Sequence, residues 1–116
     1  LIYSDGTNVN KGIINKGYYT VPSAYTAVDG DQLLVNTSAT GLNAAVTITL
    51  PLSPSIGNEV HFIDSGNFLS SNNLTIGRNG SNINGSASDL VVSTNAVAFT
   101  LVYVNATRGW VYKDKI

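Results

Sequence analysis

One apolar run, Val97–Val104, constrains the fold of this chain more than any other segment. It is rich in β-branched and aromatic residues, and it is too short for a core helix or a membrane span, so it predicts a buried β-strand. Side chains alternate along a strand, and both faces of this one are largely apolar. We therefore expect it inside a sandwich or at a contact between subunits. One face would carry Val97, Phe99, Leu101 and Tyr103.

Short segments of the same kind recur at regular spacing, separated by turn-forming Gly, Pro, Asn and Ser residues. Alternation predicts that Val46, Ile48 and Leu50 face the core, together with Val60 and Phe62. Eight short strands without helical periodicity predict an all-β protein, an antiparallel, jelly-roll-like β-sandwich. The predicted strands are Gln32–Thr37, Val46–Leu50, Glu59–Asp64, Leu74–Arg78, Ser81–Asn84, Leu90–Thr94, Val97–Val104 and Gly109–Lys113, with a tight hairpin at Asn79-Gly80.

The chain divides into a lead-in hairpin and connector over residues 1–17 and a sandwich module over residues 18–116. Within the lead-in, Ile2–Thr7 lines up with Val102–Thr107 of the predicted closing hairpin. One interpretation is that the first residues end a preceding module of the same kind. The alternative is that β-turns reuse these residue types by chance. The chain starts at Leu1 and contains no Met, so we expect a fragment or a processed piece.

Composition restricts the possible partners. The 116 residues include 6 Lys and Arg and 7 Asp and Glu, for a formal net charge of -1. This balance lacks the basic patch expected of a protein that binds nucleic acid or an anionic membrane, so we expect neither nucleic-acid binding nor membrane insertion. Because cysteine is absent, disulfides and thiolate metal sites are excluded.

Candidate catalytic residues are few, since His61 is the one histidine and Glu59 the one glutamate. They share a strand face, and an exposed cross-strand pair is the preferred interpretation over an acid–base pair. Asp64 would point to the opposite face, which excludes a pair of glycosidase carboxylates. We predict no enzyme activity, no catalytic residues and no cofactor.

Asp29 and Asp31 flank Gly30 in a predicted turn. Two carboxylates with nearby carbonyls could bind calcium, but the spaced oxygen ligands of a full calcium loop are missing. A plain turn is the preferred interpretation, and no metal site is predicted.

Tyr18 and Tyr19 lie in a glycine-flanked connector and are the only binding residues that the sequence suggests. Aromatic faces receive the apolar faces of sugar rings, so the pair could contact a glycan. The preferred alternative is that these rings pack against the sandwich or a neighbouring subunit.

Several segments, taken in order, resemble modules of tail-fibre, tailspike and other appendage proteins of tailed bacteriophages, cyanophages among them. The resemblance covers most of the chain, from about Tyr25 to Tyr112. The segments that carry it include Gly30–Thr37, Val46–Pro51, Ser53–Val60, Asn73–Ile76, Arg78–Gly85, Asp89–Val91, Leu101–Tyr103 and Gly109-Trp110.

This resemblance implies a non-catalytic structural module of a phage fibre or spike, exposed on the extracellular surface of the virion. It implies a homotrimer that contacts other virion proteins and takes part in appendage assembly and host attachment, with a host-surface glycan as a further partner. Two alternatives stay open. One is a carbohydrate-binding module of a larger secreted or virion-associated hydrolase, and the other is a capsid decoration protein.

Overall fold

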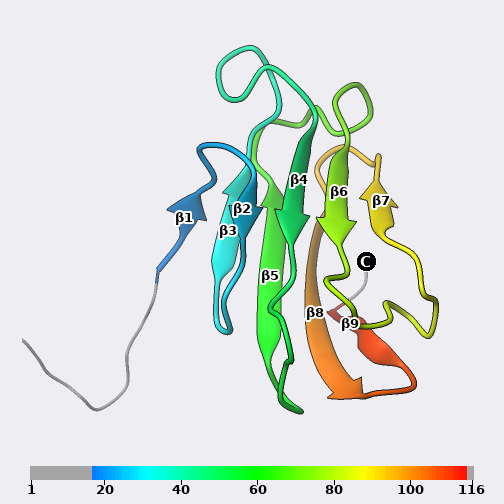
Figure 1. The fold of residues 1–116 in the computed structure, drawn as a ribbon. Coiled ribbons are helices and arrows are strands. Elements are labelled where there is room, and N and C mark those ends of the chain that lie inside the picture. The colour runs from blue at the N-terminus through cyan, green and yellow to red at the C-terminus, as the bar shows by residue number, and fades with distance from the viewer. Residues whose placement is uncertain (1–16, 115–116) are drawn as a thin grey trace, which may run out of the picture.

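The computed structural model describes residues 17–114, which fold into nine β-strands without a helix (Figure 1). This part of the chain accordingly holds no helix suited by length and apolarity to crossing a membrane. The strands are β1 (Tyr19–Thr20), β2 (Tyr25–Thr26), β3 (Gln32–Val35), β4 (Val46–Thr49), β5 (Glu59–Asp64), β6 (Leu74–Gly77), β7 (Leu90–Val92), β8 (Ala98–Asn105) and β9 (Gly109–Asp114).

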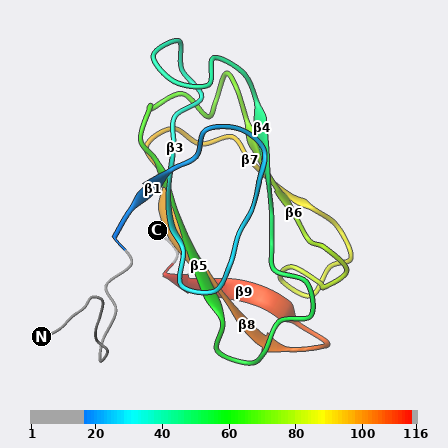
Figure 2. The same cartoon turned by 60° about the vertical axis from the view of Figure 1, so that its left-hand side comes forward.

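The strands form two layers, seen from the side in Figure 2. Sheet A has the order β1-β3-β5-β8-β9, and sheet B has the order β2-β4-β6-β7. From β1 to β6 the chain alternates between the sheets, so each connection between neighbouring strands of one sheet contains a strand of the other. The four pairings β1–β3, β2–β4, β3–β5 and β4–β6 are parallel, and the later pairings β5–β8, β6–β7 and β8–β9 are antiparallel.

The prediction of an all-β fold is confirmed, but the prediction of antiparallel, jelly-roll-like sheets is wrong, because both sheets are mixed. The physical reason is that alternation of apolar side chains reports which face of a strand is buried and carries no information on strand direction. Parallel neighbours need a long crossover, usually a helix. Here a strand of the opposite sheet serves as that crossover, so no helical segment marks the topology.

Three further differences concern individual segments. Ser81–Asn84 is not a strand, and β6 pairs with β7 rather than closing a hairpin across Asn79-Gly80. Ile83 of this segment is nevertheless buried and bridges to Trp110. The short strands β1 and β2 lie before Gln32, where the sequence predicted no strand. The predicted lead-in hairpin over residues 1–17 lies outside the described residues, apart from Gly17.

The core lies between the two sheets and is built from the predicted alternation. Val46, Ile48 and Leu50 of sheet B are buried, as are Val60 and Phe62 of sheet A, which confirms the predicted faces. Aromatic pairs extend the core towards the closing hairpin. Ring pairs in these geometries stabilise the folded protein beyond the burial of their apolar surface. Their ring centroids lie 5.2 Å apart for Phe62–Phe99, 5.6 Å for Phe99–Tyr112 and 5.7 Å for Tyr103–Trp110.

Asp64, at the end of β5, is a buried carboxylate that holds two loops together. Its Oδ2 accepts N–H groups from Phe68 at 3.1 Å, Leu69 at 3.4 Å and Ala96 at 2.9 Å. Several amide donors offset the free-energy cost of burying a carboxylate. Removing the charge leaves those donors poorly paired.

We expect Asp64→Asn to lower the free energy of unfolding by about 1–3 kcal/mol, because an amide nitrogen would face backbone N–H groups. The measurement is urea unfolding followed by fluorescence of Trp110. Asp89→Asn is the matched control, since exposed Asp89 accepts a single backbone N–H, that of Arg78 at 2.9 Å. Equal stability losses in the two variants would contradict the role assigned to Asp64.

Gly109 allows the hairpin between β8 and β9 to lie against a distant loop. Its φ is +70°, and a Cβ there would collide with the backbone carbonyl of Asn82. That carbonyl accepts the N–H of Trp110 at 2.9 Å, so Asn82 cannot retreat without losing the bond. The glycine is required for both its backbone conformation and its lack of a side chain.

Gly109→Ala should therefore destabilise the protein more than Gly80→Ala does. Gly80 has a φ of +89° with open space around the Cβ position, so its substitution adds only the backbone strain of about 1–2 kcal/mol. Parallel urea titrations of the two variants measure the difference. A Gly109→Ala loss no larger than that of Gly80→Ala would show that contact with Asn82 does not matter.

Candidate functional site

The two residues considered for acid–base chemistry have separate partners in the structure. His61 Nδ1 lies 2.6 Å from Thr100 Oγ1 on the neighbouring strand β8. Glu59 accepts from Lys113 Nζ of β9, with Oε2 at 3.2 Å, and both of these side chains are exposed. This places His61 and Glu59 in cross-strand pairs on the outer face of sheet A, as preferred from the sequence. Asp64 lies on the opposite, buried face, as predicted.

The Asp29–Asp31 turn uses its carboxylates to fix neighbouring backbone. Asp31 Oδ2 accepts the N–H of Val28 at 2.9 Å, and Asp29 Oδ1 accepts the N–H of Glu59 at 2.9 Å. These bonds attach the turn to the start of β5. Over residues 17–114 no three His, Asp or Glu side chains gather to hold a metal ion.

Tyr18, Tyr19 and Tyr25, here named the tyrosine end, lie where β1 and β2 begin the two sheets. Tyr19 is aligned with buried Leu33 and Tyr25 with buried Ile48, so both rings face the space between the sheets. The two ring centroids are 5.2 Å apart and the rings are tilted by 46°. Tyr18 is 57% exposed and Tyr19 45% exposed, because no described strand covers this end.

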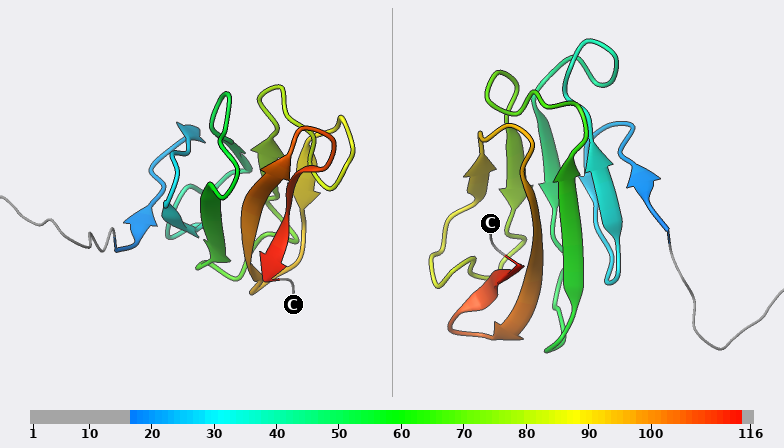
Figure 3. Two further views of the ribbon diagram at one scale, coloured as in Figure 1. Left: turned by 90° about the horizontal axis from the view of Figure 1, so that it is seen from below. Right: turned by 180° about the vertical axis from the view of Figure 1, so that it is seen from behind.

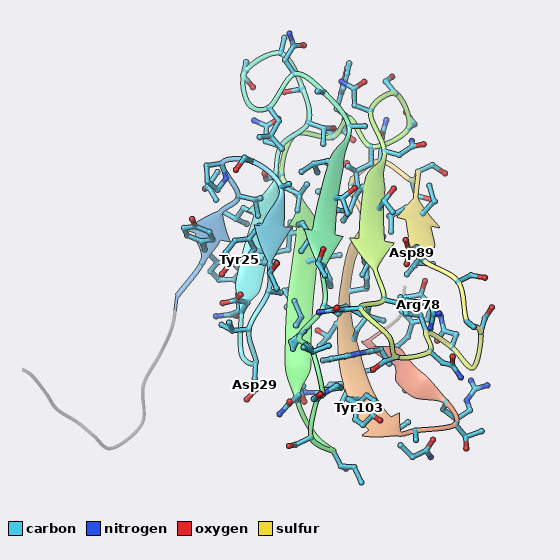
Figure 4. The ribbon with its side chains drawn as sticks, in the orientation of Figure 1. Tyr25, Asp29, Arg78, Asp89 and Tyr103 are labelled. Atoms are coloured by element: carbon cyan, nitrogen blue, oxygen red, sulfur yellow. The ribbon has the colours of Figure 1, made fainter. Side chains whose placement is uncertain are left out.

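The Tyr25 hydroxyl anchors the tyrosine end to the turn described above. It donates to Asp31 Oδ2 at 2.8 Å, and Figure 4 shows Tyr25 beside β1 and β2. Desolvation by burial, followed by the bond to the Asp31 carboxylate, raises the pKa of Tyr25 from 10.0 to about 12. Both causes disfavour the tyrosinate, which would bring a second negative charge against Asp31.

This pKa makes the stability of the tyrosine end depend on pH. Because the folded pKa lies above the unfolded value, the stabilisation is complete below pH 10.0 and is lost as the pH rises towards about 12. We expect Tyr25→Phe to lose about 1 kcal/mol of stability at neutral pH and to show a smaller further loss in the alkaline range.

The measurement is thermal unfolding at a series of pH values for the wild type and Tyr25→Phe. Tyr18→Phe is the matched control, since it removes a hydroxyl from a largely exposed ring. Identical alkaline profiles in all three proteins would contradict the assigned link between Tyr25 and Asp31.

A second feature lies at the opposite end of the two sheets, where β7 and β9 are the last strands. The views in Figure 3 show β9 far from β1. A cleft of about 220 Å³ opens there between the sheets, here named the β7–β9 cleft. Its lining combines an apolar floor with a rim of two hydroxyl residues: Val91, Val92, Val97, Phe99 and Tyr112 with Ser93 and Thr94.

The outer faces of the two sheets differ in chemistry. On sheet A, Leu34, Ile63 and Ala98 lie side by side on adjacent strands and are half-buried. On sheet B the corresponding outward positions are mainly threonines, with Thr47 beside Thr75. Sheet A therefore carries an aliphatic row, here named the Leu34–Ile63–Ala98 row, whereas sheet B presents hydroxyl groups.

No protein-family model matches this chain, and no curated protein matches it.

Of the tyrosine end and the β7–β9 cleft, only part of the tyrosine end was predicted from the sequence. Sequence reasoning selected Tyr18 and Tyr19, and the structure places both at an exposed end of the sandwich, with Tyr19 inside strand β1. It missed Tyr25 and the β7–β9 cleft, because those depend on which strands end each sheet. The Tyr25-Thr26 pair was a signal, since it repeats the aromatic and β-branched composition of Tyr19-Thr20.

Proposed function

We propose that this chain is a non-catalytic structural module of a phage fibre or spike, which contributes to appendage assembly and host attachment as a homotrimer. The observation that carries the proposal is the contrast between the two outer faces of the sandwich. A wholly solvated sandwich would present polar side chains on both outer faces. Here sheet A presents the Leu34–Ile63–Ala98 row, and sheet B presents threonines.

The outer face of sheet A is suited to contact between copies at its aliphatic positions, which alternate with the polar row Gln32, His61 and Thr100. Val102 and Val111, also half-buried, are paired in register further along the same outer face. Interfaces between subunits are enriched in such residues at their centre and carry polar groups at the rim. The Lys113–Glu59 ion pair lies on the same face beside Val102 and bridges β9 and β5 across β8. Closed rotational symmetry is the usual outcome when copies of one chain associate.

The resemblance of the sequence to phage appendage modules supplies the biological setting. A neutral, threonine-rich exterior agrees with exposure on the surface of an extracellular particle. The candidate catalytic groups on β5 serve cross-strand pairing, which agrees with a structural role.

The trimer is tested by light scattering on the isolated chain across a range of concentrations. We expect a mass of three 12.2 kDa chains for the wild type and a fall to the monomer for Ile63→Arg, since a charge would be buried in the contact. Thr47→Arg is the matched control on the outer face of sheet B and should leave the trimer intact. A wild-type monomer at all concentrations, or equal effects of the two variants, would contradict assembly through sheet A.

The virion setting is tested separately by electron microscopy of particles whose genome encodes this chain, labelled with antibodies against the module. Label on a tail fibre or spike is the expected result. Label over the capsid would favour a decoration protein instead. Unlabelled particles, together with saturable binding of a soluble glycan by the monomer, would favour a carbohydrate-binding module.

A further inference from the structure

We propose that successive copies of this module associate head to tail, with the tyrosine end of one copy packed into the β7–β9 cleft of the next. The two surfaces terminate the same pair of sheets at opposite ends. The contact is heterologous, because different surfaces of the two copies meet, and it propagates in one direction. It does not use the outer face of sheet A, so it goes beyond the proposed function and is independent of the trimer contact.

The tyrosine end exposes the inside of the sandwich rather than an outer face. Tyr19 is 45% exposed although its ring faces between the sheets, in line with fully buried Leu33. An inward-facing ring stays exposed only because no described strand lies beyond β1 and β2. A second layer of apolar side chains placed there would bury it, and aromatic rings contribute strongly to such contacts.

The β7–β9 cleft offers that layer. Phe99 and Tyr112 form its floor, with their rings edge to face at 5.6 Å, and Val91 on its margin is 58% exposed. One end of the module therefore carries exposed aromatic rings, and the other end carries an apolar cleft of about 220 Å³. This complementarity favours a second copy as the occupant.

Strand direction is compatible with this arrangement. Since β1, β3 and β5 are parallel, and β8 is antiparallel to both β5 and β9, strand β9 runs in the same direction as β1. The first part of the outer edge of β9 is already occupied, because Trp110 donates its N–H to the Asn82 carbonyl at 2.9 Å and accepts the N–H of Asn84 at 2.7 Å. The proposed contact therefore depends on side-chain packing and not on pairing of β1 with β9.

The sequence supports a like module as the neighbour of the tyrosine end. Ile2–Thr7, which precedes β1 in the sequence, aligns with Val102–Thr107 at the end of β8 and is identical to it at two of six positions, Tyr3 and Thr7. The sequence that precedes the tyrosine end therefore resembles part of the hairpin that closes the module. Under the interpretation that these residues end a preceding module, the neighbour of the tyrosine end is a module of the same kind.

The absence of cysteine allows the contact to be tested by directed cross-linking of the full chain. One preparation carries Tyr18→Cys at the tyrosine end, and a second carries Thr94→Cys on the exposed rim of the cleft. A mixture of the two is treated with a short thiol-reactive cross-linker, and mixed dimers are counted by mass spectrometry with one chain isotope-labelled. The control mixture pairs Tyr18→Cys with Leu52→Cys, whose position on the β4–β5 loop is 71% exposed.

We expect about tenfold more mixed dimer from the Tyr18–Thr94 mixture than from the control, which corresponds to about 1.4 kcal/mol of preferential association. Adding Val91→Asp to the Thr94→Cys chain should remove the excess while circular dichroism shows an unchanged fold. Equal yields in both mixtures would overturn the proposal. So would a preference of Tyr18→Cys for a second Tyr18→Cys chain, because that result indicates a two-fold contact.

Failure of the end contact can be distinguished from failure of the trimer contact on sheet A. Ile63→Arg changes the outer face of sheet A and leaves both ends intact, so the Tyr18–Thr94 cross-link should persist in that background. Loss of the cross-link in Ile63→Arg would show that the end contact depends on the trimer and would overturn their independence. The free sugars galactose and glucose, added in excess, should leave the cross-linking yield unchanged, whereas competition would indicate that the tyrosine end is a glycan site.

Discussion

The structure depends on burial of alternate side chains between two sheets that the chain visits in turn. Each passage from sheet A to sheet B and back places one more strand beside its parallel neighbour, as with β3, β4 and β5. Inward positions such as Leu33, Ile48 and Phe62 then stack in a continuous core. Since burial of apolar surface is the main favourable term in folding, this alternation holds the module together without disulfides.

The same construction explains where the surfaces of interest lie. A fold that grows by adding strands to two sheets has two open ends and two outer faces. The antiparallel strands β7, β8 and β9 finish one end only partly and leave the β7–β9 cleft. The other end is finished by two strands of two residues each, so Tyr18 and Tyr19 remain exposed. Loops at the strand ends are held by Asp31 and Asp64, whose carboxylates accept backbone N–H groups.

Alternation in the sequence was sufficient to predict the strand class and the inward residues of β4 and β5, because each depends on a period of two within one segment. It could not predict that β6 pairs with β7 rather than with Ser81–Asn84, since pairing depends on contacts between distant segments. The tyrosine pair was recognisable from its composition alone. The β7–β9 cleft was not, because Val91, Phe99 and Tyr112 become neighbours only when the sheets end there.

We propose that the outer face of sheet A is covered by other copies of the chain, while the outer face of sheet B faces solvent. The most direct measurement is NMR signal attenuation of methyl groups by a soluble paramagnetic probe. The account predicts that the methyl signals of Leu34 and Ile63 are protected, whereas those of Thr47 and Thr75 are strongly attenuated. Attenuation of both sets to the same extent, at a concentration where the wild type is assembled, would contradict it.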